Sequence, residues 1–160
     1  MNAPSAPFNP DVVSIDAIIA AFYAIISGAR GEPRDWKRDV ELFVPGARHV
    51  AMSVRDGKPV ALPMDHAAHV ARAEAVFREA GFYEREIHRV ERRYGNIAQV
   101  FSAYESRHEP DGPVFARGVN FITLFFDGDR WWIASAVWDG ERSDNPIPPD
   151  WLPSEDRRDR

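Results

Sequence analysis

The chain has 160 residues, of which 44% are hydrophobic and 28% charged, which suits one domain with a substantial core. Its formal net charge of −5 argues against a binder of nucleic-acid backbones, which usually carries a basic excess. The chain has no cysteine, which excludes disulfides and thiolate chemistry, and no apolar run long enough for a membrane span. We therefore expect neither a nucleic-acid partner nor a membrane partner.

The first ten residues are small and rich in proline. They lack the basic region and the apolar region of a signal peptide. We interpret residues 1–10 as a short flexible arm on a cytoplasmic protein.

Three segments show the apolar periodicity of helices. In residues 11–27 the apolar side chains form one stripe, and Ser14 is a candidate N-cap. Residues 34–43 are predicted to form a short second helix, and residues 65–80 a third helix capped by Asp65. The spacing predicts that the second helix presents three apolar side chains on one face, namely Trp36, Val40 and Phe43.

After the third helix the apolar period falls from 3.6 to 2, which is typical of strands. The predicted strands are residues 84–92, 97–107, 117–126 and 130–139, with a short earlier strand at 48–54. Helices followed by an antiparallel meander are the α+β pattern. We therefore predict an α+β domain whose mostly antiparallel sheet packs on three N-terminal helices.

The last strands are apolar on both of their faces, whereas a sheet with one wet face alternates apolar and polar residues. The helices can cover one face, and a second subunit is the simplest cover for the other. The sequence therefore predicts a homodimer through the sheet. Residues 145–160 form a Pro-rich, charged tail that we interpret as solvated, although Ile147 and Trp151 could attach it to the body.

Five segments, in this order and spacing, resemble the nuclear transport factor 2-like superfamily, which includes SnoaL-like and ketosteroid-isomerase-like domains. These are residues 22–28, 42–47, 101–105, 117–120 and 127–138. The resemblance covers roughly residues 11–150, and we place the domain at 11–144. It implies a cone in which a strongly curved sheet wraps around the first helix and encloses a ligand pocket. Because this fold serves isomerases, cyclases, transport adaptors and assembly domains, it does not assign a function.

The sequence departs from the ketosteroid-isomerase-like pattern at the reacting groups. The resemblance implies a carboxylate base after Leu42, but that position falls at about Ala51, which cannot abstract a proton. A second acid would fall at residues 120–122, which hold no carboxylate, and Tyr23 matches the oxyanion-binding tyrosine in character only. Steroid-isomerase chemistry is therefore disfavoured.

The predicted pocket has aromatic walls and a few polar groups. If Trp138 faces inward, strand alternation brings Trp132, Ala134 and Ala136 with it, and the small alanines either leave space for a ligand or accommodate the first helix. Candidate catalytic residues are His49, Tyr104 and Tyr23. The predicted ligand-binding residues are Phe22, Tyr23, Trp36, Phe43, His49, Tyr104, Asn120, Trp132 and Trp138.

A metal centre and a cofactor are not expected. Asp65, His66 and His69 have a spacing that could hold a metal, but no third distant ligand accompanies them, and they also suit an ordinary helix start. Arg117 could bind a ligand carboxylate, although an ion pair with Glu105 on the neighbouring strand is the expected use.

Three functions remain open from the sequence. The chain could bind a small, apolar molecule without chemistry, or catalyse an isomerase-, lyase- or cyclase-type step on one. It could also be a non-catalytic interaction subunit. An enzyme would need a titratable side chain facing an enclosed cavity.

Overall fold

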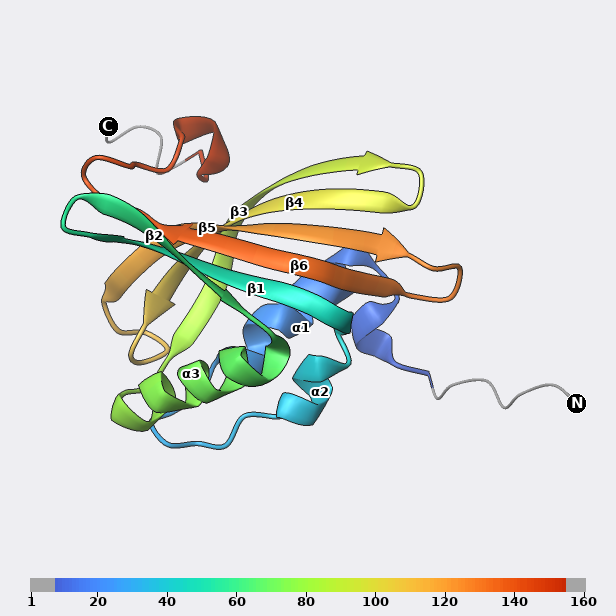
Figure 1. Ribbon diagram of the computed structural model, residues 1–160, viewed down its shortest axis with the longest axis horizontal. Helices are drawn as coiled ribbons and strands as arrows, with labels where there is room; N and C mark the ends of the chain where they lie inside the picture. The colour runs from blue at the N-terminus through green and yellow to red at the C-terminus, as the bar shows by residue number, and fades with distance from the viewer. Residues whose placement is uncertain (1–7, 155–160) are drawn as a thin grey trace, which may run out of the picture.

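A computed structural model describes residues 8–154, so most of the predicted N-terminal arm and the end of the predicted tail lie outside the described residues. Six strands form one curved sheet with three α-helices on one of its faces (Figure 1). The last described segment lies on the opposite face. The predicted α+β architecture is confirmed. Within residues 8–154 no helix is long and apolar enough to cross a membrane.

The helices begin where the sequence places their caps. After a short 3-10 turn, η1 (Pro10–Val12), helix α1 (Ile15–Ile26) starts with the Ser14 side chain accepting a hydrogen bond from the Ala17 amide. Helix α3 (His66–Glu79) starts in the same way, with Asp65 accepting from the Ala68 amide. Helix α2 (Trp36–Val40) is shorter than predicted, because the chain leaves it early to enter the first strand.

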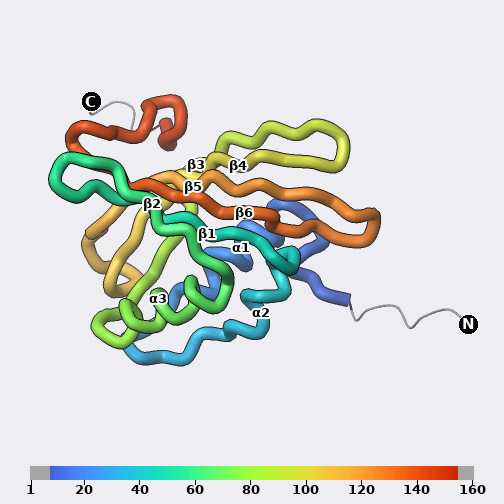
Figure 2. Tube along the Cα trace, in the orientation of Figure 1, coloured from blue at the N-terminus to red at the C-terminus, as the bar shows by residue number. Residues whose placement is uncertain are grey.

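The sheet has the order β2-β1-β6-β5-β4-β3, and only the β1–β6 pair is parallel. Figure 2 follows the chain along these neighbours. Strand β2 was not predicted, because two prolines obscure its pattern; as an edge strand it tolerates them. The strands are β1 (Phe43–Arg55), β2 (Lys58–Met64), β3 (Tyr83–Tyr94), β4 (Ile97–Arg107), β5 (Val114–Phe126) and β6 (Trp131–Gly140).

The core lies between α1 and the concave face of the sheet. Ile18 and Ile19 of α1 are almost fully buried, and the sheet contributes fully buried side chains from three strands, namely Val100, Ile122, Leu124 and Ile133. The apolar stripe predicted for the first helix therefore faces the sheet, which fixes Phe22 and Tyr23 at the same interface.

A β-bulge in β6 corrects the predicted orientation of Trp132. Thr123 pairs with Ser135 and Leu124 with Ile133, so Ala134 is an extra residue in β6. The extra residue reverses the face that each side chain occupies. Trp138 therefore contacts His69 on the helix side, whereas Trp132 donates its Nε1 hydrogen to Asp127 outside the core. The prediction that Trp132 and Trp138 share a face was wrong.

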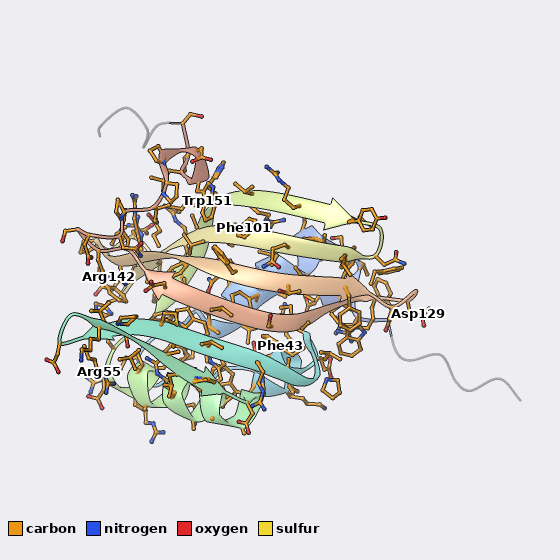
Figure 3. The ribbon with its side chains drawn as sticks, turned by 45° about the horizontal axis from the view of Figure 1, so that its top comes forward. Phe43, Arg55, Phe101, Asp129, Arg142 and Trp151 are labelled. Atoms are coloured by element: carbon orange, nitrogen blue, oxygen red, sulfur yellow. The ribbon has the colours of Figure 1, made fainter. Side chains whose placement is uncertain are left out.

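The face of the sheet away from the helices is partly covered by the chain's own C-terminal segment. The end of this segment forms the 3-10 turn η2 (Pro149–Trp151). Ile147 and Leu152 are buried there, and the Trp151 ring stacks on Phe101 with centroids 5.2 Å apart (Figure 3). Our interpretation of the tail as solvated is wrong for this segment, and the attachment through Ile147 and Trp151 is correct. The homodimer stays a prediction.

Candidate functional site

A cavity of about 230 Å³ lies between α1, α3 and the concave face of the sheet. Its walls include five aromatic side chains, namely Phe22, Phe77, Phe82, Phe115 and Trp138. Its polar lining includes Asp39, His69, Glu84, Tyr104, Ser106 and Asn120. The exposed side chains of Arg72, Val76 and Phe115 mark its opening to solvent. An apolar cavity with a few convergent polar groups is the usual form of a small-molecule site.

Glu84 places a carboxyl group in the wall of this cavity. It lies near the start of β3, opposite Ser106 of β4, and the Ser106 hydroxyl donates a 2.7 Å hydrogen bond to it. Glu84 is partly exposed, yet burial of its carboxyl group raises its pKa to about 7. At neutral pH this carboxyl group can therefore hold or release a proton.

Asp39 places a second carboxyl group in the cavity wall, from helix α2. The residue is only 2% exposed, and its Oδ2 has no hydrogen-bond partner among the described residues. The Nε2 atom of His66 lies 3.6 Å from that oxygen, which is too long for a hydrogen bond. Burial raises the pKa of Asp39 to about 7. Its carboxyl group is thus a second candidate acid or base.

Sequence reasoning missed both carboxyl groups. Asp39 follows Trp36 by three residues, so it lies beside the apolar face of its helix. This spacing was the only sign in the sequence that Asp39 could be buried. Glu84 stands at the start of a strand and has the appearance of a solvated end. The two residues are not at the positions that the ketosteroid-isomerase-like pattern implies.

Tyr104 lines the cavity beside Glu84. Its register partner on β5 is Gly118, and a Cβ atom there would collide with the Tyr104 hydroxyl. Burial, with the nearby charge of Glu84, raises the pKa of Tyr104 above its ordinary value, so the phenol stays protonated at neutral pH. Tyr104 can therefore donate a hydrogen bond to a bound molecule.

Tyr23 belongs to a hydrogen-bond chain behind the cavity wall. The Asn120 amide donates to the Tyr23 hydroxyl over 2.9 Å, and that hydroxyl lies 2.6 Å from Ser102 Oγ. Because Ser102 in turn donates to Glu86, the Tyr23 proton must point to Ser102. Tyr23 does not line the cavity, and its proton is already engaged. These hydrogen bonds hold the side chain of Asn120, which does line the cavity, in a fixed orientation.

His49 lies behind the cavity wall, covered by His69. The two imidazole rings stack 4.2 Å apart, and the His69 ring also meets Trp138 edge-on at 5.8 Å. Burial lowers the pKa of His49 to about 3 and that of His69 to about 4. Both rings are therefore neutral at pH 7. Within residues 8–154 no group of three or more His, Asp or Glu side chains is placed to hold a metal ion.

The structure divides the predicted ligand-binding residues into three sets. Four of them line the cavity, namely Phe22, Tyr104, Asn120 and Trp138. Three are buried beside it without lining it, namely Tyr23, Phe43 and His49. Trp36 and Trp132 lie elsewhere: Trp36 stacks on Phe77 and donates to Glu74, and Trp132 lines a separate hollow of about 530 Å³ beside α2, β1 and the start of α3. Neither lines this cavity, and their prediction as ligand-binding residues stays a prediction.

Arg117 and Glu105 lie 3.5 Å apart, so the predicted ion pair is confirmed. A groove of about 350 Å³ beside the C-terminal segment is larger than the cavity, but it lies on the outer face of the sheet. Its acidic lining residues are Asp139 and Glu141, and Asp139 is paired with Arg142. The cavity is therefore the stronger candidate site.

Solved structures with a similar fold were found, whereas no protein-family model and no curated protein matched the sequence. An NTF-2-like protein of unknown function from Silicibacter pomeroyi is 20% identical, with a TM-score of 0.54 over 79% of this chain and 92% of its own. A presumed ketosteroid isomerase from Parabacteroides distasonis is 12% identical, with a TM-score of 0.56 over 84% and 98%.

A third similar structure is the β subunit of a presumed aromatic-ring-hydroxylating dioxygenase from Novosphingobium aromaticivorans. It is 18% identical, with a TM-score of 0.57 over 83% of this chain and 94% of its own. At these identities the likeness is one of fold. The resemblance predicted from the sequence is confirmed at that level.

Proposed function

We propose that this protein, which has the nuclear transport factor 2-like fold, binds a small and mostly apolar molecule in the cavity between α1, α3 and the sheet. The observation that supports this most directly is the combination of five aromatic walls with Glu84, Asp39 and Tyr104 in one cavity. Its volume of about 230 Å³ is below the roughly 300–1,000 Å³ of drug-sized sites. The ligand is therefore smaller than a typical drug.

A second function, a proton-transfer reaction of the isomerase, lyase or cyclase type, is favoured by the two carboxyl groups. A general acid or base works best when its pKa lies near the working pH, and burial brings both Glu84 and Asp39 to about 7. Tyr104 supplies a neutral hydrogen-bond donor in the same cavity. One similar structure carries the name of an isomerase, which agrees with this chemistry without assigning it.

The binding proposal can be tested by filling the cavity. Ala73 of α3 lines it, whereas Ala75 of the same helix is exposed and does not. We expect 2-phenylethanol to raise the melting temperature of the unaltered protein and of Ala75→Phe. Ala73→Phe should lose that shift, because the new ring occupies the binding space. An equal shift in both variants would show that the probe binds elsewhere.

A further inference from the structure

We propose that the ligand of the cavity is a small amine whose ammonium group pairs with Glu84. This inference rests on the proposed function, because it names the ligand class of the same cavity. It leaves Asp39 as the carboxyl group that is free for proton transfer. Three features of the cavity support it, namely its charges, its rings and the direction of the Glu84 hydrogen bond.

Among the described residues that line the cavity, the charged groups in its interior are acidic, and no cationic side chain lies beside them. Arg72 is the cationic side chain among the lining residues, and it is exposed at the opening. His69 is neutral at pH 7, because burial lowers its pKa to about 4. When Glu84 ionises, its charge is thus left for a ligand to balance. A buried carboxylate without a cation is costly, and an ammonium group removes that cost.

Aromatic rings surround the position of this carboxyl group. Phe82 precedes Glu84 by two residues in extended chain, so the two side chains point to the same side. The Phe82 ring lies 5.0 Å from the Phe77 ring and 6.2 Å from the Phe115 ring, measured between centroids. The faces of such rings attract cations. The walls therefore favour an ammonium group over an anionic one, and they also suit an aromatic body.

The hydrogen bond at Glu84 favours its ionised form. The Ser106 hydroxyl donates to the carboxyl oxygen, and Ser106 itself is 2% exposed. A hydrogen bond donated to a carboxylate stabilises the charged state, so it lowers the pKa of Glu84 against the larger effect of burial. Glu84 is thus arranged to accept hydrogen bonds, and an ammonium group supplies further donors.

The pairing has a defined pH dependence. Burial raises the pKa of Glu84 to about 7, so the carboxylate that an ammonium group requires forms as the pH rises from 6 to 8. The affinity for an amine should therefore increase about tenfold over that range, following the ionised fraction of one such group. A neutral molecule that accepts a hydrogen bond from protonated Glu84 would bind more weakly as the pH rises.

The experiment compares 2-phenylethylamine with 2-phenylethanol, which differ in the ammonium group. Isothermal titration calorimetry at pH 6 and pH 8 measures the dissociation constants. We expect the amine to bind more tightly than the alcohol at pH 8, with its affinity rising about tenfold between the two pH values. Glu84→Gln should remove the advantage of the amine and leave the alcohol bound. Glu79→Gln, which changes the same charge on the exposed surface of α3, should keep it.

The outcomes separate this inference from the function on which it rests. If the alcohol binds as tightly as the amine at both pH values, the amine inference is overturned and the binding cavity stands. If neither probe binds, both are overturned. The comparison of the two probes on the unaltered protein decides the matter even if Glu84→Gln does not fold, which circular dichroism would reveal.

Discussion

The imidazole rings of His49 and His69 stack within 2° of parallel, and His69 separates His49 from the cavity. Neither ring nitrogen of His49 has a hydrogen-bond partner among the described residues, and the residue is 1% exposed. His49 therefore serves as an apolar ring that supports the cavity wall. A proton on it would be buried without compensation.

This stack predicts a loss of stability in acid. The pKa of His49 is lowered to about 3 by burial and by the charges of His69 and His66, so the folded state binds its proton less readily than the unfolded state does. The stabilisation is complete above the unfolded pKa of about 6.5 and declines as the pH falls from there towards the folded pKa. His49→Phe should lose less stability than the unaltered protein between pH 7 and pH 4.5 in urea unfolding. Parallel pH profiles for the two proteins would contradict the account.

The contribution of Asp39 to stability should have the opposite pH dependence. Its raised pKa of about 7 means that the folded state favours the protonated form, so its contribution is lost as the pH rises through 7. Replacing it with a neutral isostere, Asp39→Asn, should therefore raise the free energy of unfolding at pH 8 by about 1–3 kcal/mol. The gain should shrink at pH 5. A variant that is less stable than the unaltered protein at pH 8 would show that Asp39 is stabilised as a carboxylate.

The hydrogen-bond chain through Tyr23 makes a prediction about stability. Tyr23→Phe leaves the buried groups of Asn120 and Ser102 without their shared partner, which should cost about 1–3 kcal/mol in urea unfolding. Tyr94→Phe is the matched control, because Tyr94 is 85% exposed, and it should have no measurable effect. Equal stability of the two variants would mean that the hydrogen bonds of Tyr23 make no net contribution to the free energy of unfolding.

The predicted homodimer can be tested at Phe121. This side chain is 40% exposed on the outer face of the sheet, beside the ring of Trp151. If the sheets of two subunits pack there, the unaltered protein should sediment as a dimer at micromolar concentration. Phe121→Asp should then sediment as a monomer, because it would place a charge in the interface. A monomeric unaltered protein would remove the dimer from the account.

The parts of the fold that local chemistry determines could be predicted from the sequence. The caps at Ser14 and Asp65 and the long strands follow from side-chain hydrogen bonding and from apolar periodicity. The bulge at Ala134 could not be predicted, because alternation carries no sign of an inserted residue. For the same reason, the orientation of Trp132 could not be predicted.

The sequence predicted part of the aromatic lining of the candidate site, together with Asn120, and neither of its carboxyl groups. Phe22 and Trp138 follow from helix and strand faces, which a sequence displays. The importance of Asp39 and Glu84 arises from burial by segments distant in the chain, and residue type alone carries no information about burial. Ser106, which donates to Glu84, lies 22 residues away and becomes its neighbour through strand pairing.

The central claim is that a small molecule binds in the cavity between α1, α3 and the sheet. The NMR signals of the indole N–H groups of the five tryptophans test it most directly. Trp138 lines the cavity, whereas Trp132 and Trp151 do not. In a titration with 2-phenylethanol followed by NMR, with the signal assigned through Trp138→Phe, the Trp138 resonance should shift while those of Trp132 and Trp151 stay in place. A shift at Trp151 or Trp132 would contradict the account even if Trp138 also shifts, because Trp138 and Trp151 both line the groove on the outer face.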